Sequence, residues 1–110
     1  MSDQVTPLRA AASQVPIEAD KAHARTLLTA DGVRVVVLAI AAGSGLAEHR
    51  TPKHPLLMQA LNGEVTVTIA GEDTVLRPGD FLHLDAGVLH AVHADVDSHL
   101  GLLLLNSAAG

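Results

Sequence analysis

The stretch Gly79-Asp80-Phe81-Leu82-His83-Leu84-Asp85-Ala86-Gly87-Val88-Leu89-His90 decides the fold that we predict for this chain. It contains two tight corners, Gly79-Asp80 and Ala86-Gly87, on either side of a short apolar strand over residues 81–84. Glycine favours such corners because it accepts positive φ without steric cost. His90 follows the second corner, three residues after Gly87. The pattern therefore predicts a strand and a turn that aim one imidazole at a fixed point.

The residues on both sides of this stretch predict more short strands, with a turn every few residues. The expected strands cover residues 25–29, 33–40, 56–61, 64–70, 74–76, 91–94 and 99–105, with Asp31-Gly32 and Asn62-Gly63 as tight hairpin turns. Residues 46–55 are expected to form a loop. Residues 15–17 are expected to form a first edge strand, because proline is tolerated in strands at the edge of a sheet. This spacing, with no helix longer than one turn, predicts an all-β sandwich or small barrel.

Residues 33–40 are the most apolar of these expected strands. Their nearly continuous Val, Leu and Ile content suits a strand that is buried on both faces. A helix over residues 33–42 is the alternative. The triplet of valines and the stop at Gly43-Ser44-Gly45 favour the strand.

Length and composition indicate a single domain with an aliphatic core. The chain has 110 residues, of which 48% are hydrophobic and 17% charged, and Phe81 is its only Phe, Tyr or Trp. We expect an N-terminal arm with the first edge strand over residues 1–22 and one barrel domain over residues 23–110. Histidine, with seven residues, is the one residue type that is unusually frequent in this chain.

Composition also argues against several classes of partner. A net charge of −5 without a basic stripe argues against nucleic acid and anionic membranes. The longest apolar run, residues 35–42, is far shorter than the ~20 residues that a membrane-spanning helix needs. Cysteine is absent, so no disulfide or thiolate site is indicated. Residues 1–15 show no signal-peptide pattern, and we expect a soluble cytoplasmic protein.

Two stretches of the chain resemble the paired sequence motifs of the cupin superfamily. The resemblance covers about residues 25–105, and the spacing between the two motifs is that of compact bacterial members. It implies a double-stranded β-helix, an RmlC-like jelly-roll barrel of two packed antiparallel sheets, of the small and functionally uncharacterised kind. The matching positions are four glycines at expected turns and two histidines: Gly43, Gly63, Gly79, Gly87, His49 and His90.

The resemblance implies a metal site at the centre of the barrel, with two of the four usual ligands replaced. His49 and His90 occupy ligand positions, whereas Thr51 stands at the second histidine position and Leu56 at the glutamate position. His54 lies two residues before Leu56 and shares its face if the strand extends that far back. We therefore expect His49, His54 and His90 to hold a divalent metal ion: Fe, Mn, Ni or Zn.

Further residues are expected near this site, and some residues of the predicted site can also be explained without a role in binding. His54 is also explained as a solvated loop residue, and Met58 as a core side chain. His83 is expected to line the cavity or to lie at a subunit interface, and His23, His93 and His99 to lie at the surface or an interface. The residues expected to line the pocket are Thr51, Leu56, Met58, Ala60 and His83.

Two functions are consistent with such a site. A metal with open positions would let a small organic acid or polyol chelate it, and the resemblance implies dioxygenase, isomerase or decarboxylase activity. The alternative is a small-molecule-binding or sensor protein without metal, which the apolar Leu56 favours. We also expect a homodimer, formed by N-terminal strand exchange or sheet-to-sheet packing, on the assumption that the apolar residues 33–40 and 99–105 lie at sheet edges.

Overall fold

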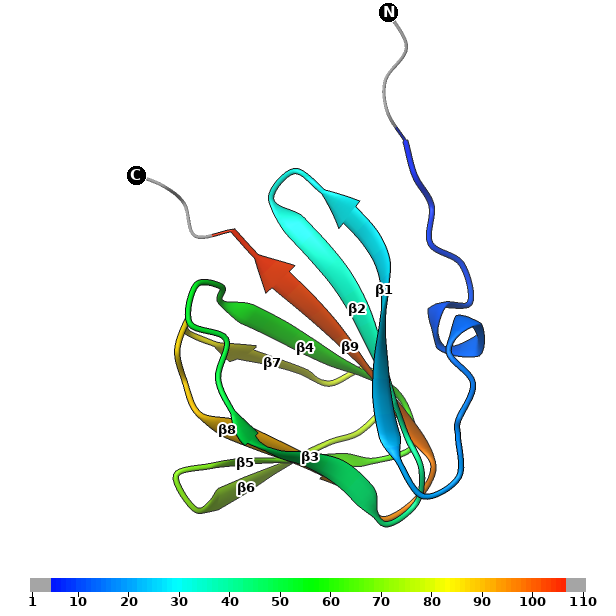
Figure 1. Cartoon of the computed structure of the whole chain (residues 1–110), viewed down its shortest axis with the longest axis vertical. Helices are drawn as coiled ribbons and strands as arrows, with labels where there is room; N and C mark the ends of the chain where they lie inside the picture. The colour runs from blue at the N-terminus through cyan, green and yellow to red at the C-terminus, as the bar shows by residue number, and fades with distance from the viewer. Residues whose placement is uncertain (1–4, 107–110) are drawn as a thin grey trace, which may run out of the picture.

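The computed structural model describes residues 5–106, which form nine strands and one 3₁₀ helix (Figure 1). Along the chain these elements are η1 (Ala11–Gln14), β1 (Ala22–Ala30), β2 (Val33–Ile40), β3 (Ser44–His49), β4 (Leu56–Asn62), β5 (Val65–Ile69), β6 (Glu72–Leu76), β7 (Phe81–Leu84), β8 (His90–Ala94) and β9 (Ser98–Leu105). No helix within these residues is long and apolar enough to cross a membrane.

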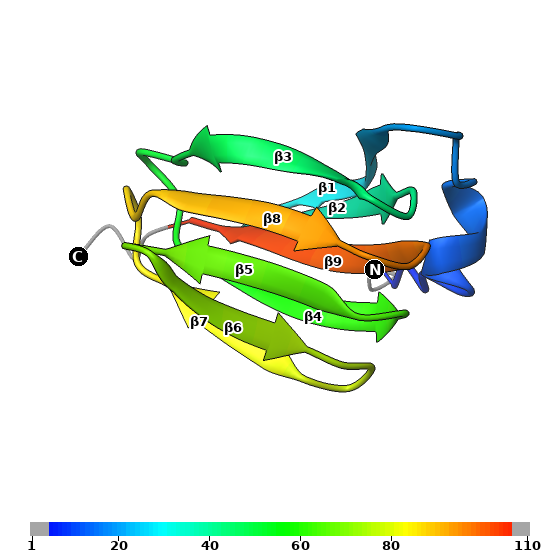
Figure 2. The same ribbon diagram turned by 90° about the horizontal axis from the view of Figure 1, so that it is seen from below.

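The strands form two sheets that face each other (Figure 2). Their order is β1-β2-β9-β4-β7 in the five-stranded sheet and β3-β8-β5-β6 in the four-stranded sheet, and neighbouring strands are antiparallel. This arrangement confirms the predicted all-β jelly-roll fold. The turn at residues 31–32, the segment 50–55 and the turn at residues 85–89 lie at the same end of the barrel, which we call the mouth (Figure 1).

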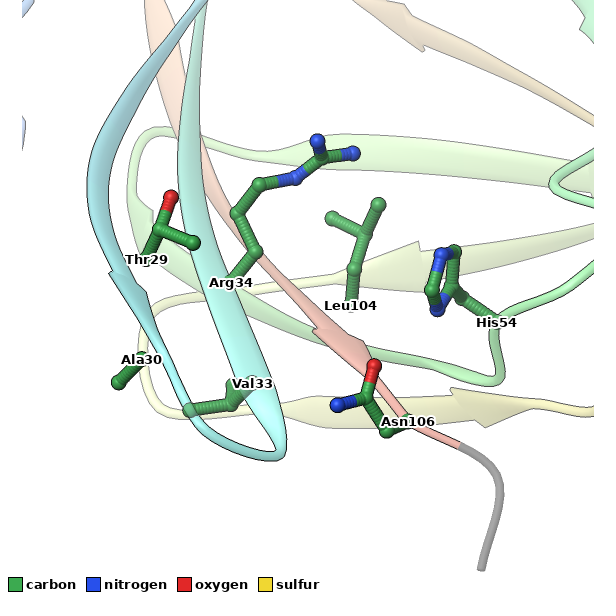
Figure 3. A pocket seen from close by; sticks show the side chains of 7 residues that line it. All are labelled: Thr29, Ala30, Val33, Arg34, His54, Leu104 and Asn106. Atoms are coloured by element: carbon green, nitrogen blue, oxygen red, sulfur yellow. The ribbon is translucent and has the colours of Figure 1, made fainter. Parts of the chain in front are cut away.

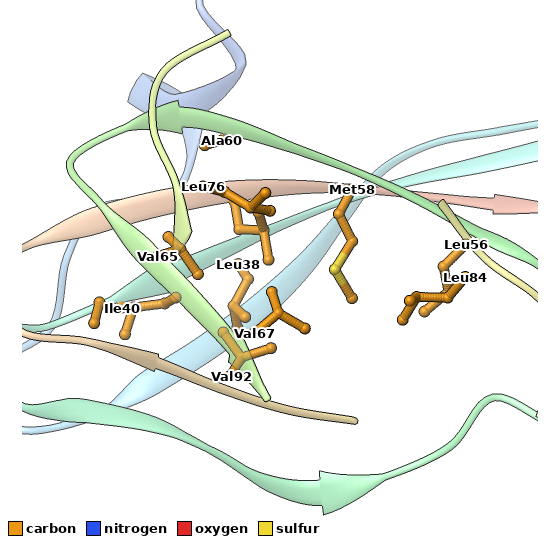
Figure 4. Close-up of a cluster of buried hydrophobic side chains, with 12 residues drawn as sticks. Leu38, Ile40, Leu56, Met58, Ala60, Val65, Val67, Leu76, Leu84 and Val92 are labelled. Carbon is orange, nitrogen blue, oxygen red and sulfur yellow. The ribbon is translucent and has the colours of Figure 1, made fainter. Parts of the chain in front are cut away.

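The main hydrophobic core fills the space between the two sheets (Figure 4). Leu56, Met58 and Ala60 are buried on β4 while the residues between them are only partly buried, as strand alternation requires. Val65 and Val67 approach from β5 in the other sheet, and both are fully buried. The core therefore consists of aliphatic side chains and Met58, with no aromatic ring.

A second, smaller cluster covers part of the outer face of the five-stranded sheet. Val15 packs there against Val37 and Ala39 of β2. The buried ring of His99 bonds through Nε2 to the carbonyl of Val15 at 2.7 Å. This hydrogen bond fastens the N-terminal arm to the sheet, so β2 is buried on both faces as predicted.

Three sequence-based expectations about the elements are wrong. Residues 44–49 form β3 rather than part of a loop, because pairing with β8 supplies hydrogen bonds that the local sequence does not reveal. Residues 15–17 are not a strand; the first strand begins at Ala22. Asn62-Gly63 does not close a hairpin, because β4 and β5 belong to different sheets.

The assumption about sheet edges is also wrong. β2 and β9 are interior strands of the five-stranded sheet, and its edges are β1 and β7. Their backbone groups are thus paired with neighbouring strands of the same chain, and the case for a dimer has to rest on a face of the sheet and not on these strands as edges.

The four glycines expected at turns, Gly43, Gly63, Gly79 and Gly87, all have positive φ, between 70° and 96°. Gly63 carries a second constraint. A Cβ at this residue would collide with the side chain of Ser98 and lie 2.6 Å from the carbonyl oxygen of Asp97. Only glycine fits at this crossing between the two sheets, because both its conformation and its surroundings exclude a side chain.

Candidate functional site: two histidines at the barrel mouth

His49 and His90 face each other at the mouth of the barrel. His49 is the last residue of β3 and His90 is the first of β8, and the antiparallel register places them directly opposite. Their ring centroids lie 4.4 Å apart, with the ring planes inclined by 55°. The fold therefore brings together two imidazoles that are 41 positions apart in the chain.

Both rings are held by the same local hydrogen bond. Nδ1 of His49 lies 3.0 Å from the carbonyl oxygen of Ala47, and Nδ1 of His90 lies 2.9 Å from that of Val88. A carbonyl oxygen can only accept, so each Nδ1 carries the proton and donates it. In the neutral ring, Nε2 then presents a lone pair, which is the form in which histidine binds a metal or accepts a proton.

Burial favours the neutral form of His90. Its side chain is only 2% exposed, whereas His49 is exposed. Desolvation by burial lowers the pKa of His90 below 6.5, and the neighbouring His49 lowers this pKa further, against the opposing effect of the hydrogen bond to Val88. His90 is therefore suited to donate a lone pair at neutral pH.

A backbone hydrogen bond connects the two segments that carry these histidines. The N–H of Gly87 donates to the carbonyl oxygen of Thr51 at 3.0 Å. Thr51 lies two residues after His49, and Gly87 lies three residues before His90. The turn at residues 85–89 and the segment 50–55 are thus joined beside the histidine pair.

The third expected ligand is placed elsewhere. His54 is partly buried, and its Nδ1 donates to the carbonyl oxygen of Leu105 at 3.1 Å. In residues 5–106 no group of three or more His, Cys, Asp or Glu side chains is arranged to hold a metal ion. His54 therefore does not complete a three-residue group with His49 and His90 in this structure.

The residues expected to line the pocket have different surroundings. Leu56, Met58 and Ala60 are buried in the core between the sheets, and Thr51 is partly buried in the segment 50–55. His83 is exposed on β7, on the face opposite to the buried Leu84. The side chains that β4 turns toward the interior are consequently apolar.

The other histidines make contacts that do not involve the pair. His93 is exposed and bonds to the carboxylate of Asp95 at 2.8 Å. His23 lies 2.8 Å from the carbonyl oxygen of Pro16. His93 is thus a surface residue and His23 a partly buried one, whereas His99 is buried, contrary to expectation, because its ring bonds to the N-terminal arm.

A cavity that the sequence did not indicate lies beside the mouth (Figure 3). Its volume is about 220 Å³. The lining residues come from the β1–β2 hairpin, the end of β9 and the segment 50–55: Thr29, Ala30, Val33, Arg34, His54, Leu104 and Asn106. The only signal in the sequence was Arg34, a charged residue within an otherwise apolar strand.

The donor set fits a metal ion only in part. Two neutral imidazoles suit Fe, Mn, Ni or Zn, but Thr51 offers a weak oxygen ligand and Leu56 offers none. The described residues therefore fit an ion that takes two ligands from the protein and the others from water or a chelating molecule. They do not fit an ion that requires three or four ligands from the protein.

Comparison with known proteins agrees with this architecture. Residues 36–106 match the model of the Cupin domain family. Over 57 residues the chain is 33% identical to quercetin 2,3-dioxygenase of Bacillus subtilis (strain 168), an alignment that covers 52% of this chain and 16% of the relative. The chain thus spans about a sixth of the length of that curated relative.

Solved structures resemble nearly the whole chain. A conserved protein of unknown function from Streptococcus pyogenes, SPY1581, is 22% identical with a TM-score of 0.80, covering 97% of this chain and 93% of its own. A cupin superfamily protein from Desulfitobacterium hafniense is 23% identical with a TM-score of 0.80, covering 96% and 94%. At these identities the likeness establishes the fold.

Proposed function

The chain belongs to the cupin family, and from this premise we propose that it binds a divalent transition metal through His49 and His90 together with a small organic ligand. The observation that carries the proposal is the histidine pair itself. Its two rings lie 4.4 Å apart, and each Nδ1 is engaged by a backbone carbonyl, so both Nε2 atoms are free to bind. Fixing the tautomer through a backbone carbonyl is how proteins orient histidine ligands.

Metal coordination at this place would leave positions for the ligand. When bound, such an ion acts as a Lewis acid and polarises an oxygen of whatever molecule chelates it. The protein contributes the orientation of the two imidazoles through the hydrogen bonds at their Nδ1 atoms. His54 as a third ligand remains a prediction, and a loop rearrangement would be needed for it.

Enzymatic activity is proposed at the level of class only. The partial match to quercetin 2,3-dioxygenase supports an oxygenase among the three classes considered, which also include isomerase and decarboxylase. Because the match covers 52% of this chain, it supports the shared barrel and not a shared substrate. A cytoplasmic location likewise remains a prediction.

The alternative function is a small-molecule-binding or sensor protein that needs no metal. The apolar side chain of Leu56, which is 4% exposed and stands at the glutamate position of the cupin motif, favours this alternative. Pockets that bind small molecules are lined mainly by apolar side chains with a few polar groups.

Metal titration of chelator-treated, tag-free protein distinguishes the two functions. We expect Mn²⁺, Ni²⁺ or Zn²⁺ to bind with one ion per chain and to raise the melting temperature, because binding to the native state stabilises it. His49→Ala and His90→Ala should abolish the shift, whereas the matched control His93→Ala should retain it.

The same titration tests the third ligand. If His54 coordinates the ion, His54→Ala should weaken binding as much as the other two substitutions; with two protein ligands it should have little effect. Failure of the unmodified protein to bind any of these ions would leave the metal-free alternative.

We further propose that the chain forms a homodimer through the outer face of the five-stranded sheet. Alternation along β4 and β9 turns Leu57 and Leu103 to this face, where they pair with each other. Phe81 lies on the same face and is 57% exposed. The N-terminal arm packs on its own chain, which favours sheet-to-sheet packing over exchange of the arm.

A further inference from the structure

We propose that the cavity beside the mouth binds a small hydroxycarboxylate anion, with Arg34 holding the carboxylate and His54 accepting a hydrogen bond from the hydroxyl group. The inference rests on the proposed function only in that it names the class of the organic ligand. Binding of the anion itself does not require a metal.

Arg34 is placed on the inner side of the sheet. The register aligns Thr29, Arg34 and Leu104 in one row across β1, β2 and β9, and Leu104 pairs in turn with Leu56. Leu56 and Leu104 belong to the core between the sheets, so this row faces the interior at the mouth. Arg34 is exposed at this end, so its guanidinium group is accessible to a molecule that enters the cavity.

The charge of Arg34 is not compensated within the cavity. The lining contains no Asp or Glu, and Arg34 forms no ion pair with any of the residues described here. A guanidinium group offers a planar fork of donors that matches a carboxylate with two parallel hydrogen bonds. The hydroxyl of Thr29 and the amide of Asn106 are further donors in the same lining.

His54 offers a hydrogen-bond acceptor, whereas Arg34 offers donors. Its Nδ1 donates to the carbonyl oxygen of Leu105, so the neutral ring offers an acceptor at Nε2. Figure 3 shows the His54 ring and the Arg34 side chain on either side of Leu104. A ligand that carries an anionic group and a hydroxyl group satisfies both, whereas a simple anion satisfies only Arg34.

Backbone hydrogen bonds fix the walls of the cavity. The N–H of Leu105 donates to the carbonyl of Pro55 at 2.9 Å, and the N–H of Asn106 donates to the carbonyl of Gly32 at 3.0 Å. The end of β9 is therefore held between the segment that carries His54 and the hairpin that carries Arg34. The backbone of the walls is therefore ordered before a ligand binds, which limits the conformational entropy lost on binding.

The size of the cavity limits the ligand. A volume of about 220 Å³ is below the range of roughly 300–1,000 Å³ typical of pockets for drug-sized molecules. The cavity therefore suits a small acid rather than a nucleotide or a sugar chain.

The test uses chelator-treated protein and follows the Arg34 side-chain Nε–H signal by NMR while lactate is added. We expect saturable shifts at this signal and at the Asn106 amide. Lactamide, the neutral analogue, and the Arg34→Gln variant should each bind about tenfold more weakly, as expected for the loss of a charge-assisted hydrogen bond. Arg77→Gln makes the same charge change at the opposite end of the barrel and should bind like the unmodified protein.

Propionate, which lacks the hydroxyl group, tests the role of His54. Lactate should bind about two- to tenfold more tightly than propionate, and His54→Ala should remove this preference without removing the binding. The backbone spectrum of each variant checks that it is folded.

Three results would overturn the proposal: no shift at Arg34 with lactate, equal weakening by Arg34→Gln and Arg77→Gln, or binding of inorganic phosphate but not of lactate. Because no metal is present, these failures are separate from a failure of the histidine pair to bind metal. Conversely, loss of metal binding in His49→Ala leaves the anion titration as an independent measurement.

Discussion

The backbone of Gly87 is hydrogen-bonded to the backbone of Thr51, with 3.0 Å between nitrogen and oxygen. This bond joins the two segments that carry His49 and His90 at a point within three residues of each histidine. It connects a turn that follows β7 with a segment that follows β3, and these strands belong to different sheets. The pairing of β3 with β8 in the four-stranded sheet sets the two imidazoles opposite each other, and this bond holds their two segments together beyond the last paired residues.

Substitution of Gly87 should weaken this connection. Gly87→Ala is expected to lower the free energy of unfolding by about 1–2 kcal/mol, because φ is +83° and left-handed backbone is costly for a residue with a Cβ. No atom lies within 4 Å of the added Cβ, so the effect comes from conformation and not from a clash. Urea unfolding measures the stability, and metal titration measures the site.

Gly43→Ala is the matched control for Gly87→Ala. Gly43 has φ +82° and the same open surroundings, but lies between β2 and β3 at the end of the barrel opposite to the mouth. Both variants should lose similar stability, and only Gly87→Ala should also weaken metal binding. Equal metal affinity in the two variants would show that the link between Gly87 and Thr51 does not position the histidines.

The burial of His90 predicts a pH dependence of stability in metal-free protein. The pKa of His90 is lowered in the folded state, so between that pKa and about 6.5 the unfolded chain binds more protons than the folded chain. Stability should therefore fall as the pH decreases through 6.5, and this contribution should be complete above it.

Urea midpoints between pH 5 and pH 8, compared for the unmodified protein and His90→Gln, measure this contribution. The stability advantage of the unmodified protein over His90→Gln should shrink as the solution becomes acidic. His49→Gln should retain most of the pH dependence, since desolvation is a larger cause than the charge of His49. An advantage that grows at acidic pH contradicts the predicted direction of the pKa shift.

The sequence predicted the strands whose signal is local. Residues 33–40 and 81–84 form strands with the expected bounds, because a run of apolar residues between glycine turns specifies them. β3 was missed because Ala47, Glu48 and His49 are all exposed and show no alternation. Its pairing with β8, more than 40 residues away, is what makes it a strand.

The candidate site, like the strands, was predictable from the sequence only in part. The pairing of His49 with His90 followed from the motifs, which report on long-range register. The place of His54 did not, because it depends on a hydrogen bond to Leu105, 51 residues later in the chain. The position of Arg34 beside the same cavity depends on the order of β1, β2 and β9, which no local pattern specifies.

The outer face of the five-stranded sheet predicts a dimer that a single charge should disrupt. In light scattering at micromolar concentration we expect twice the mass of the chain for the unmodified protein and the monomer mass for Phe81→Glu, because a buried unpaired carboxylate is costly. Val75→Glu adds the same charge to β6 of the other sheet, where Val75 is 38% exposed, and should leave the dimer intact. A monomeric unmodified protein would exclude this interface.

Leu56 offers the sharpest test of the proposed metal site, because the substitution Leu56→Glu adds a carboxylate at the position where the cupin motif carries one. Without metal the variant should be less stable than the unmodified protein by several kcal/mol, on the order of the cost of burying an unpaired charge, since Leu56 is 4% exposed. With metal it should bind more tightly, because a third protein ligand joins the two imidazoles. Leu56→Gln is the control: it has nearly the same shape without the charge and should lose stability with a smaller gain in affinity. If Leu56→Glu recovers no stability when Mn²⁺, Ni²⁺ or Zn²⁺ is added, the carboxylate does not reach a metal held by His49 and His90, and residue 56 is not at a ligand position in this chain.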